Sequence, residues 1–198
     1  MINVGIVIFD EVDVLDFAGP FEVFGISLDA KSQALFNVFT VAEKRHIKAQ
    51  NGLLIQANYL FYHHPEIDVL VIAGGSAAKV VELHNPEMKR WLNQVQPDCQ
   101  ITLSISTGSF ILAEMGLLNG RSATTHHLDI ERMTLDYPRI EVIDQVQYVD
   151  QGHIISAAGG TSALYASLYV VAKLTESSVA EATAGYMAFD WRDDHADK

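Results

Sequence analysis

Cysteine and basic residues are scarce in this sequence of 198 residues. A single cysteine, Cys99, cannot form an internal disulfide bond or supply a zinc cluster, so the sequence favours a reducing compartment and a cytoplasmic protein. Thirteen Lys and Arg against 25 Asp and Glu give a formal net charge of −12, which makes nucleic acid a poor partner because binding to phosphates depends on basic side chains. These shortages exclude a disulfide framework and a zinc finger.

Long hydrophobic runs are also missing. The most apolar stretches, such as DVLVIAGG and ASLYVVAKL, are shorter than the roughly 18 to 20 residues that cross a bilayer, so no membrane partner is expected. The first residues, MINVGIVIFDEVDVLD, have no basic segment before the apolar run and predict a β-strand rather than a signal peptide. With 49% hydrophobic and 19% charged residues, we expect one folded domain over residues 1–198, frayed from about residue 191.

Apolar runs of strand length alternate with segments of helical periodicity along the chain. Strands are predicted over residues 2–9, 35–42, 53–57, 69–73 and 100–105, and helices over 16–28, 85–95, 108–115, 161–174 and 178–189. Pro20 is expected in the first turn of its helix, where the missing N–H costs nothing. Residues 142–149 and 153–157 predict a β-hairpin around a turn containing Gly152.

This alternation predicts an α/β fold, a doubly wound and mostly parallel sheet with helices on both faces (a flavodoxin-like three-layer sandwich), plus a small β-hairpin. The carboxyl ends of parallel strands meet at one edge of such a sheet, and ligands bind there beside a topological switch point. Residues 10–16, 74–77 and 104–108 follow strands at this edge. We therefore expect the functional site among them.

The segment Ser104-Ile105-Ser106-Thr107-Gly108 has the layout of a nucleophile elbow, with Ser106 at the apex between a strand and a helix. In this interpretation the amide of Thr107, together with an amide of Gly74 or Gly75, forms an oxyanion hole. The alternative is that Ser106 caps the helix that begins near Gly108. The residues alone leave both open.

Asp16 stands in apolar sequence, after Val14-Leu15 and before Phe17-Ala18-Gly19-Pro20. Burial would raise the pKa of its carboxyl group, which could then act as a general acid or stabilise a nearby anion. The alternative is again a helix cap.

Thr125-His126-His127 and Asp129 place two imidazoles and an acid just before a predicted helix. Neighbouring histidines in an extended segment point to opposite faces, so we do not expect them to bind one metal ion together. Gly74-Gly75-Ser76 is too short for a phosphate-binding fingerprint. No metal or nucleotide site is predicted.

Five segments taken together resemble the ThiJ/PfpI superfamily, within the class I glutamine amidotransferase-like fold, and most closely its isonitrile hydratase subgroup. They are GIVIFDEVDVLDFAGPFEVF (5–24), DVLVIAGG (68–75), STGSFILAEMGLLNGRSATTHH (106–127), YVDQGHIISAAGGTSALYASLYVV (148–171) and AEATAGYMAFDW (180–191). The resemblance implies a homodimer without metal or organic cofactor. It also implies a site in which an elbow cysteine adds to the carbon of an isonitrile, assisted by the acid of an LDxxGP motif, to give an N-substituted formamide.

By motif, Asp16 matches that acid and Ser106 stands at the cysteine position, where the sequence departs from the family. Cys99 lies seven residues upstream, near the start of the strand, and cannot substitute. A serine hydroxyl needs an adjacent base, and Thr107 follows where protease-like relatives have a histidine, which leaves His126 or His127 as the candidate. Ser106 is either a natural replacement or an engineered one. The stretch 159–165, GGTSALY, also lacks a glycine and an aspartate that are common in relatives.

The leading hypothesis is an isonitrile hydratase-like enzyme, a carbon–nitrogen lyase, with low or no turnover while position 106 is serine. Its site would comprise Asp16 and Ser106 as catalytic residues, with a pocket and oxyanion hole formed by Gly74, Gly75, Thr107, Gly108, Thr125 and His126. The alternative is a non-catalytic small-molecule-binding or sensor domain, which would regulate transcription through a DNA-binding segment on a separate partner chain. A glyoxalase or deglycase activity is a weaker alternative because it also depends on the missing thiol.

Overall fold

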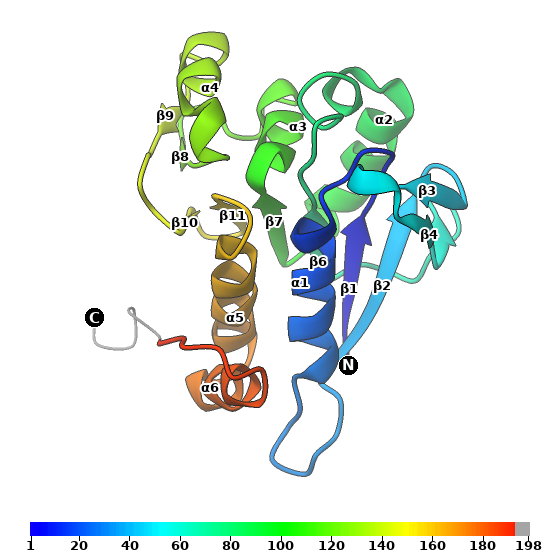
Figure 1. The fold of residues 1–198 in the computed structure, drawn as a ribbon, viewed down its shortest axis with the longest axis vertical. Coiled ribbons are helices and arrows are strands. Elements are labelled where there is room, and N and C mark those ends of the chain that lie inside the picture. The colour runs from blue at the N-terminus through cyan, green and yellow to red at the C-terminus, as the bar shows by residue number, and fades with distance from the viewer. Residues whose placement is uncertain (193–198) are drawn as a thin grey trace.

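A central sheet of seven strands organises the computed structural model, which describes residues 1–192 (Figure 1). The strand order is β10-β11-β7-β6-β1-β2-β5, and every neighbouring pair is parallel except β10 and β11. The strands are β1 (Ile2–Val7), β2 (Phe36–Ala42), β5 (Tyr59–Leu60), β6 (Val69–Ile72), β7 (Ile101–Ile105), β10 (Tyr148–Asp150) and β11 (Ile154–Ala157). The prediction of a mostly parallel, doubly wound α/β sheet is confirmed.

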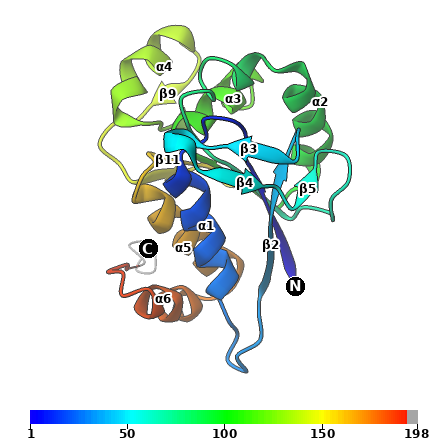
Figure 2. The same cartoon turned by 45° about the vertical axis from the view of Figure 1, so that its right-hand side comes forward.

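Helices cover both faces of the sheet. On one face α1 (Val14–Ile26) packs against α5 (Ser162–Leu174), which in turn packs against α6 (Ser177–Tyr186). The other face carries α2 (Pro86–Val95) and α3 (Ser109–Glu114), with α4 (Ile130–Asp136) beyond them (Figures 1 and 2). Asn85 begins α2 as predicted, since its side chain accepts from two backbone amides of the first turn and Pro86 stands at the first position.

The predicted hairpin is shorter than expected and is not a separate unit. Its strands β10 and β11 pair through Tyr148–Asp150, and β11 also pairs with β7, so the hairpin forms one edge of the central sheet. Two small strand pairs lie outside that sheet. They are β3 (His46–Lys48) with β4 (Leu54–Gln56), and β8 (Ser122–Ala123) with β9 (Glu141–Val142). The predicted strand at 53–57 is therefore a satellite strand, and residues 142–147 divide between β9 and a loop.

One further prediction about the chain was wrong. Helix α1 begins at Val14, so Pro20 lies in its interior and leaves the carbonyl of Asp16 without its usual helical N–H donor. Trp191 is only 6% exposed, so the chain is still packed at the position where fraying was expected. The rest of the predicted tail, residues 193–198, lies outside the described residues.

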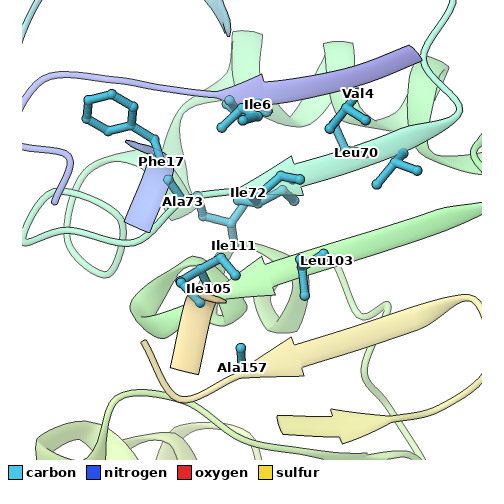
Figure 3. Close-up of a cluster of buried hydrophobic side chains, with 14 of the residues drawn as sticks. Val4, Ile6, Phe17, Leu70, Ile72, Ala73, Leu103, Ile105, Ile111 and Ala157 are labelled. Atoms are coloured by element: carbon cyan, nitrogen blue, oxygen red, sulfur yellow. The ribbon is translucent and has the colours of Figure 1, made fainter. Parts of the chain in front are cut away.

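The hydrophobic core explains why the strands have this order. Strands β1, β6, β7 and β11 are almost continuously apolar and lie side by side, as strands that are covered on both faces must be. Figure 3 shows their side chains packed together with Phe17 of α1 and Ile111 of α3. Within residues 1–192 no helix is long and apolar enough to cross a bilayer.

Candidate functional site

Four neighbouring strands deliver the predicted site residues to one edge of the sheet. The segment after β1 leads into α1 and Asp16, β6 is followed by Gly74, β7 by Ser106, and β11 by Gly159 and Gly160. Because these strands are parallel neighbours, the segments that follow them meet at their carboxyl ends. The predicted site residues therefore meet at the edge of the sheet where the topology placed them.

Ser106 has the strained backbone of a nucleophile elbow. Its φ is 53°, in the left-handed region that L-residues with a side chain seldom adopt, and its side chain is almost completely buried, at 2% exposure. Its carbonyl oxygen accepts hydrogen bonds from Thr125 Oγ1 at 3.1 Å and Ser109 Oγ at 3.0 Å. The capping alternative is wrong, since α3 begins only at Ser109 and has no side-chain cap.

Two glycines pack directly against Ser106. A Cβ atom on Gly159 would lie 2.4 Å from Ser106 Cβ and 2.8 Å from its hydroxyl oxygen, and Gly159 itself has a φ of +94°. A Cβ atom on Gly74 would lie 2.7 Å from Ser106 Cβ. Only glycine fits at these two positions, and the space around the hydroxyl is narrow.

Asp16 is the acid of this site and is as buried as Ser106. It is the third residue of α1, 2% exposed, and the residue at the capping position is Asp13, so the capping alternative is wrong for Asp16 too. Its Oδ1 accepts from the amide of Gly160 at 3.2 Å. No donor in the described part of the chain forms a hydrogen bond of normal geometry with Oδ2. A Cβ atom on Gly74 would lie 2.6 Å from this Oδ2, which places the oxygen beside the elbow.

The environment of Asp16 favours its protonated form. Burial raises the pKa of its carboxyl group to about 7, against the lowering effect of the Gly160 amide, and the nearby charge of Asp13 raises it further. The amide of Gly74 and the hydroxyl of Ser106 lower the pKa slightly. A carboxyl group with this pKa can donate or accept a proton near neutral pH.

One of the amides expected in the oxyanion hole, that of Gly75, has a partner within the turn. The hydroxyl of Thr107 accepts from the amide of Gly75 and donates to its carbonyl, both at 2.9 Å, so the Gly75 amide already has a partner. Gly108 faces β6 rather than the elbow, because a Cβ atom there would lie 2.4 Å from the carbonyl oxygen of Ile72. Gly75 and Gly108 therefore hold the turn together in this conformation.

The two histidines lie on the outer side of the elbow and do not point to opposite faces. Their ring centroids are 4.3 Å apart, because residues 127–129 form a short 3-10 turn instead of an extended segment. His126 Nδ1 accepts from the amide of Leu128 at 3.4 Å and lies 3.9 Å from Asp129 Oδ2. Burial and the neighbouring His127 lower the pKa of His126. These contacts direct Nδ1 toward its own turn.

An ion pair that sequence reasoning missed lies beside the histidines. Lys79 Nζ contacts both carboxylate oxygens of Asp129, at 2.5 and 2.6 Å, and Asp129 is 7% exposed at its side chain. Lys79 lies in the loop after β6, and the residues on either side of it form no motif that would distinguish it from a surface lysine. Among the described residues, no group of three or more His, Cys, Asp or Glu could hold a metal ion.

Cys99 is remote from the site, as expected. Its sulfur contacts the carbonyl oxygens of Ile67 and Val95, and it precedes β7, whereas Ser106 follows it. Burial raises the pKa of the Cys99 thiol to about 12, so the group is an inert thiol at neutral pH.

Comparisons with known proteins agree with this architecture. The chain is 31% identical over 128 residues to the HTH-type transcriptional regulator CdhR of Pseudomonas aeruginosa, an alignment that covers 64% of this chain and 37% of the regulator. It is 24% identical over 125 residues to the isonitrile hydratase of Pseudomonas putida, covering 63% of this chain and 52% of the hydratase. The match thus spans about a third to a half of the length of these two relatives.

Structural and family comparisons cover more of the chain. The crystal structure of a ThiJ/PfpI family protein from Pseudomonas syringae superposes with a TM-score of 0.83 at 22% identity, over 98% of this chain and 77% of that one. The model of the DJ-1/PfpI family matches residues 3–173. The chain belongs to the DJ-1/PfpI family.

Proposed function

We propose that this chain binds a small molecule at the elbow and serves as a ligand-sensing domain that does not turn the ligand over. The observation that carries the proposal is the pair at the centre of the site, a serine hydroxyl beside a buried carboxyl group. The site has kept its strained turn, its acid and its close glycine packing. It has a hydroxyl group where the family resemblance implies a thiol.

The chemistry of that pair favours binding over covalent catalysis. A cysteine thiol ionises near neutral pH, whereas a serine hydroxyl becomes a nucleophile only with a well-placed base. Asp16 is the acid–base group next to Ser106, and a pKa of about 7 makes it a weak base toward an alcohol. Among residues 1–192, His126 Nδ1 contacts the amide of Leu128 and the carboxylate of Asp129, both within its own turn. The Ser106 hydroxyl is therefore suited to hydrogen bonding.

The relatives support a sensing role. CdhR is named as a transcriptional regulator, and the region that this chain matches is only 37% of its length. A sensing domain of this kind would transmit ligand occupancy to a DNA-binding segment, on the same chain or on a partner. The pronounced negative charge of the present chain argues against direct DNA contact by the domain itself.

Isonitrile hydration is the second candidate, and the Asp16 carboxyl group favours it. A group with a pKa of about 7 next to the elbow is suited to donate a proton to a reacting carbon or nitrogen atom at neutral pH. The isonitrile hydratase of Pseudomonas putida is a relative at 24% identity. This activity would require a nucleophile at position 106.

One comparison separates the two candidates. The hydration of a simple alkyl isonitrile, measured as formamide formation, should be absent in the protein as it stands and in Ser106→Ala. It should appear in Ser106→Cys, made with Cys99→Ser so that the elbow thiol is the only one. Formamide production by the unmodified serine protein, lost in Ser106→Ala, would overturn the sensing proposal and establish a hydroxyl-dependent hydratase. His126→Ala would then test for the base.

We also propose that the chain forms a homodimer, as the family resemblance implies. The exposed apolar side chains of α1 and β4 support this, with Leu15 44%, Phe21 38% and Leu54 77% exposed. Size-exclusion chromatography with light scattering should give twice the 21.8 kDa chain mass. A monomer mass at all concentrations would refute it.

A further inference from the structure

A cavity of about 110 Å³ lies beyond the carboxyl ends of β1 and β2, apart from the elbow. It is enclosed between α2, β3 and the segments that follow β1 and β2. Its lining residues are Ile8, Phe9, Asp10, Glu43, Lys44, Ile47, Phe61, Glu82 and Met88. The carboxyl edge of a parallel sheet is where folds of this kind bind ligands, and none of these residues belongs to the elbow.

The cavity is apolar inside and charged at its mouth. The apolar residues of its wall are at most 3% exposed, and they are Ile8, Phe9, Ile47, Phe61 and Met88. By contrast, the side chains of Asp10 and Lys44 are 43% and 61% exposed. A molecule that arrives from solvent therefore meets charged groups first, and the space behind them suits an apolar chain.

Two carboxylates beside this cavity share a single amide donor. Asn85 Nδ2 donates to Glu82 Oε2 at 2.9 Å and to Glu43 Oε2 at 2.8 Å. Glu82 is only 9% exposed, and Asn85 is its one hydrogen-bond partner in the part of the chain that the structure describes, so Oε1 has no donor. This oxygen is not among the fully enclosed side-chain atoms, and Glu82 lines the cavity, so a group that enters the cavity can reach it.

Negative charge predominates around the cavity. Lys44, the basic residue of its lining, contacts Asp10 Oδ2 at 2.5 Å, and this hydrogen bond lowers the pKa of Asp10. Burial raises the pKa of Glu82, and the neighbouring charge of Glu43 raises it further. The Asn85 amide and the charge of Lys44 offset only part of this effect. Within residues 1–192 neither Glu43 nor Glu82 forms an ion pair, and no acid cluster there could hold a metal ion, so the cation that suits the cavity is organic.

We infer that this cavity binds a short primary alkylamine in its ammonium form. The alkyl chain lies against the apolar wall, and the ammonium group stays at the mouth, where one N–H donates to Glu82 Oε1 and the charge faces Glu43. The volume equals that of about three or four water molecules, which limits the chain to about three or four carbon atoms. A lysine side chain of another protein does not suit this order of polarity, because its ammonium group would have to enter first. The inference concerns a second site and does not depend on the function proposed for the elbow.

Two methionine methyl signals in a ¹H–¹³C correlation spectrum of the intact protein report separately on the cavity and on the elbow. Met88 lines the cavity. Met133 Sδ lies 3.9 Å from Ser109 Oγ, which donates to the carbonyl oxygen of Ser106 at the elbow. A ligand of the cavity should therefore shift the Met88 signal and leave the Met133 signal unchanged.

Five probes at neutral pH test the ligand class: propylammonium, methylammonium, 1-propanol, butyrate and Nα-acetyl-lysine N-methylamide. Propylammonium should shift the Met88 signal with a Kd on the order of millimolar. Methylammonium, which has the charge without the chain, should bind about tenfold more weakly. The same loss of about tenfold is expected for 1-propanol, which has the chain without the charge. Butyrate and the lysine derivative should leave the signal unchanged, the first because of its negative charge and the second because its chain cannot enter first.

Variants assign the effect to Glu82. Glu82→Gln keeps an oxygen for the Asn85 amide but has no charge, and it should lose about tenfold in affinity for propylammonium while its affinity for 1-propanol stays the same. Glu43→Gln should lose about two- to fivefold, since Glu43 contributes charge without the hydrogen bond. Glu181→Gln is the matched control, because it removes one exposed acid from α6, which lies on the other face of the sheet. It should bind propylammonium as the unmodified protein does.

The outcomes separate this inference from the function proposed for the elbow. If 1-propanol or butyrate shifts the Met88 signal with the affinity of propylammonium, the ligand class is wrong. Equal binding of methylammonium or of the lysine derivative, or unchanged binding in Glu82→Gln, also overturns the inference. A shift of the Met133 signal alone would place the amine at the elbow, which refutes the second site and supports the proposed function. If no probe shifts the Met88 signal, the cavity is not a ligand site. The comparison of probes needs only the unmodified protein, so it does not depend on the folding of a variant.

Discussion

Replacing Asp16 with Asn should remove a large pH dependence from the stability of this protein. Asn has nearly the same shape as Asp and keeps an oxygen for the Gly160 amide, but it cannot ionise. The expected change is therefore in how the free energy of unfolding varies with pH. Any constant cost, such as that of an amide group placed where Oδ2 stood, shifts the whole curve without altering its slope.

The magnitude follows from the burial of the carboxyl group. The pKa of Asp16 is about 7 in the folded chain and near 3.8 when exposed, so between these values the folded state retains a proton that the unfolded state has lost. Stability therefore falls as the pH rises from about 4 to about 7, and is flat above. A tenfold change in an equilibrium constant is worth about 1.4 kcal/mol, so the full effect is about 4 kcal/mol.

Urea unfolding measured between pH 4.5 and 8.5 by circular dichroism tests this prediction. The free energy of unfolding of Asp16→Asn minus that of the unmodified protein should grow by about 2–4 kcal/mol across this range, with most of the change below pH 7. Other titrating groups cancel in the difference. Asp29→Asn, which lacks such burial, should follow the unmodified protein. Parallel curves for Asp16→Asn and the unmodified protein would show that the carboxyl group is not held in its neutral form by burial.

Three further predictions concern the packing around the elbow and the lone thiol. Gly159→Ala should destabilise the protein by about 3 kcal/mol or more, because the added Cβ atom would clash with Ser106. Gly160→Ala should cost only about 1 kcal/mol, because Gly160 has a φ of +58° but open space around it. Equal losses of stability in thermal unfolding of the two variants would contradict this prediction. Thr125→Val should cost about 1–2 kcal/mol by leaving the Ser106 carbonyl with one hydroxyl donor instead of two, and a loss below about 0.3 kcal/mol in urea unfolding would show that this bond does not hold the turn. Cys99, whose thiol pKa is raised to about 12, should react with Ellman's reagent at pH 8 at least about 100-fold more slowly in the folded protein than in urea, and comparable rates would mean that the thiol is accessible.

The sheet could be predicted from the sequence because its strands are marked by composition alone. Strands β1, β6 and β7 are mostly buried and rich in Ile, Val and Leu, and each is followed by unusual residues. Those residues, Asp16, Gly74 and Ser106, do meet in space. The small strands β3 and β8 escaped prediction because two or three residues of backbone pairing leave no periodicity to detect.

The contacts that decide the chemistry of the site could not be predicted, because they join residues far apart in the chain. Gly159 and Gly160 stand more than 140 residues from Asp16, and nothing in a Gly-Gly pair says which side chain it will contact. The Lys79–Asp129 pair crosses 50 residues in the same way. The hydroxyl of Thr107 forms hydrogen bonds with both the amide and the carbonyl of Gly75. This contact depends on the side-chain rotamer of Thr107, which no sequence motif specifies. The sequence predicted which residues meet at this edge of the sheet, and only the structure shows which of their groups have partners.

Asp16, rather than Ser106, is the residue of the candidate site whose presence the packing does not explain. The strained turn at Ser106 has structural support that does not depend on the side-chain atom at that position: its carbonyl oxygen accepts from two hydroxyls, and Gly108 lets the turn lie against Ile72. Such a turn persists when a thiol is replaced by a hydroxyl. Asp16 is different, because burial raises the pKa of its carboxyl group to about 7 and so reduces stability at neutral pH, and an apolar residue would pack there at lower cost. A buried acid with a raised pKa at the carboxyl edge of a parallel sheet is a candidate for a functional group. In the sensing proposal, the acid is the group that contacts the ligand, and the serine hydroxyl holds the ligand without reacting.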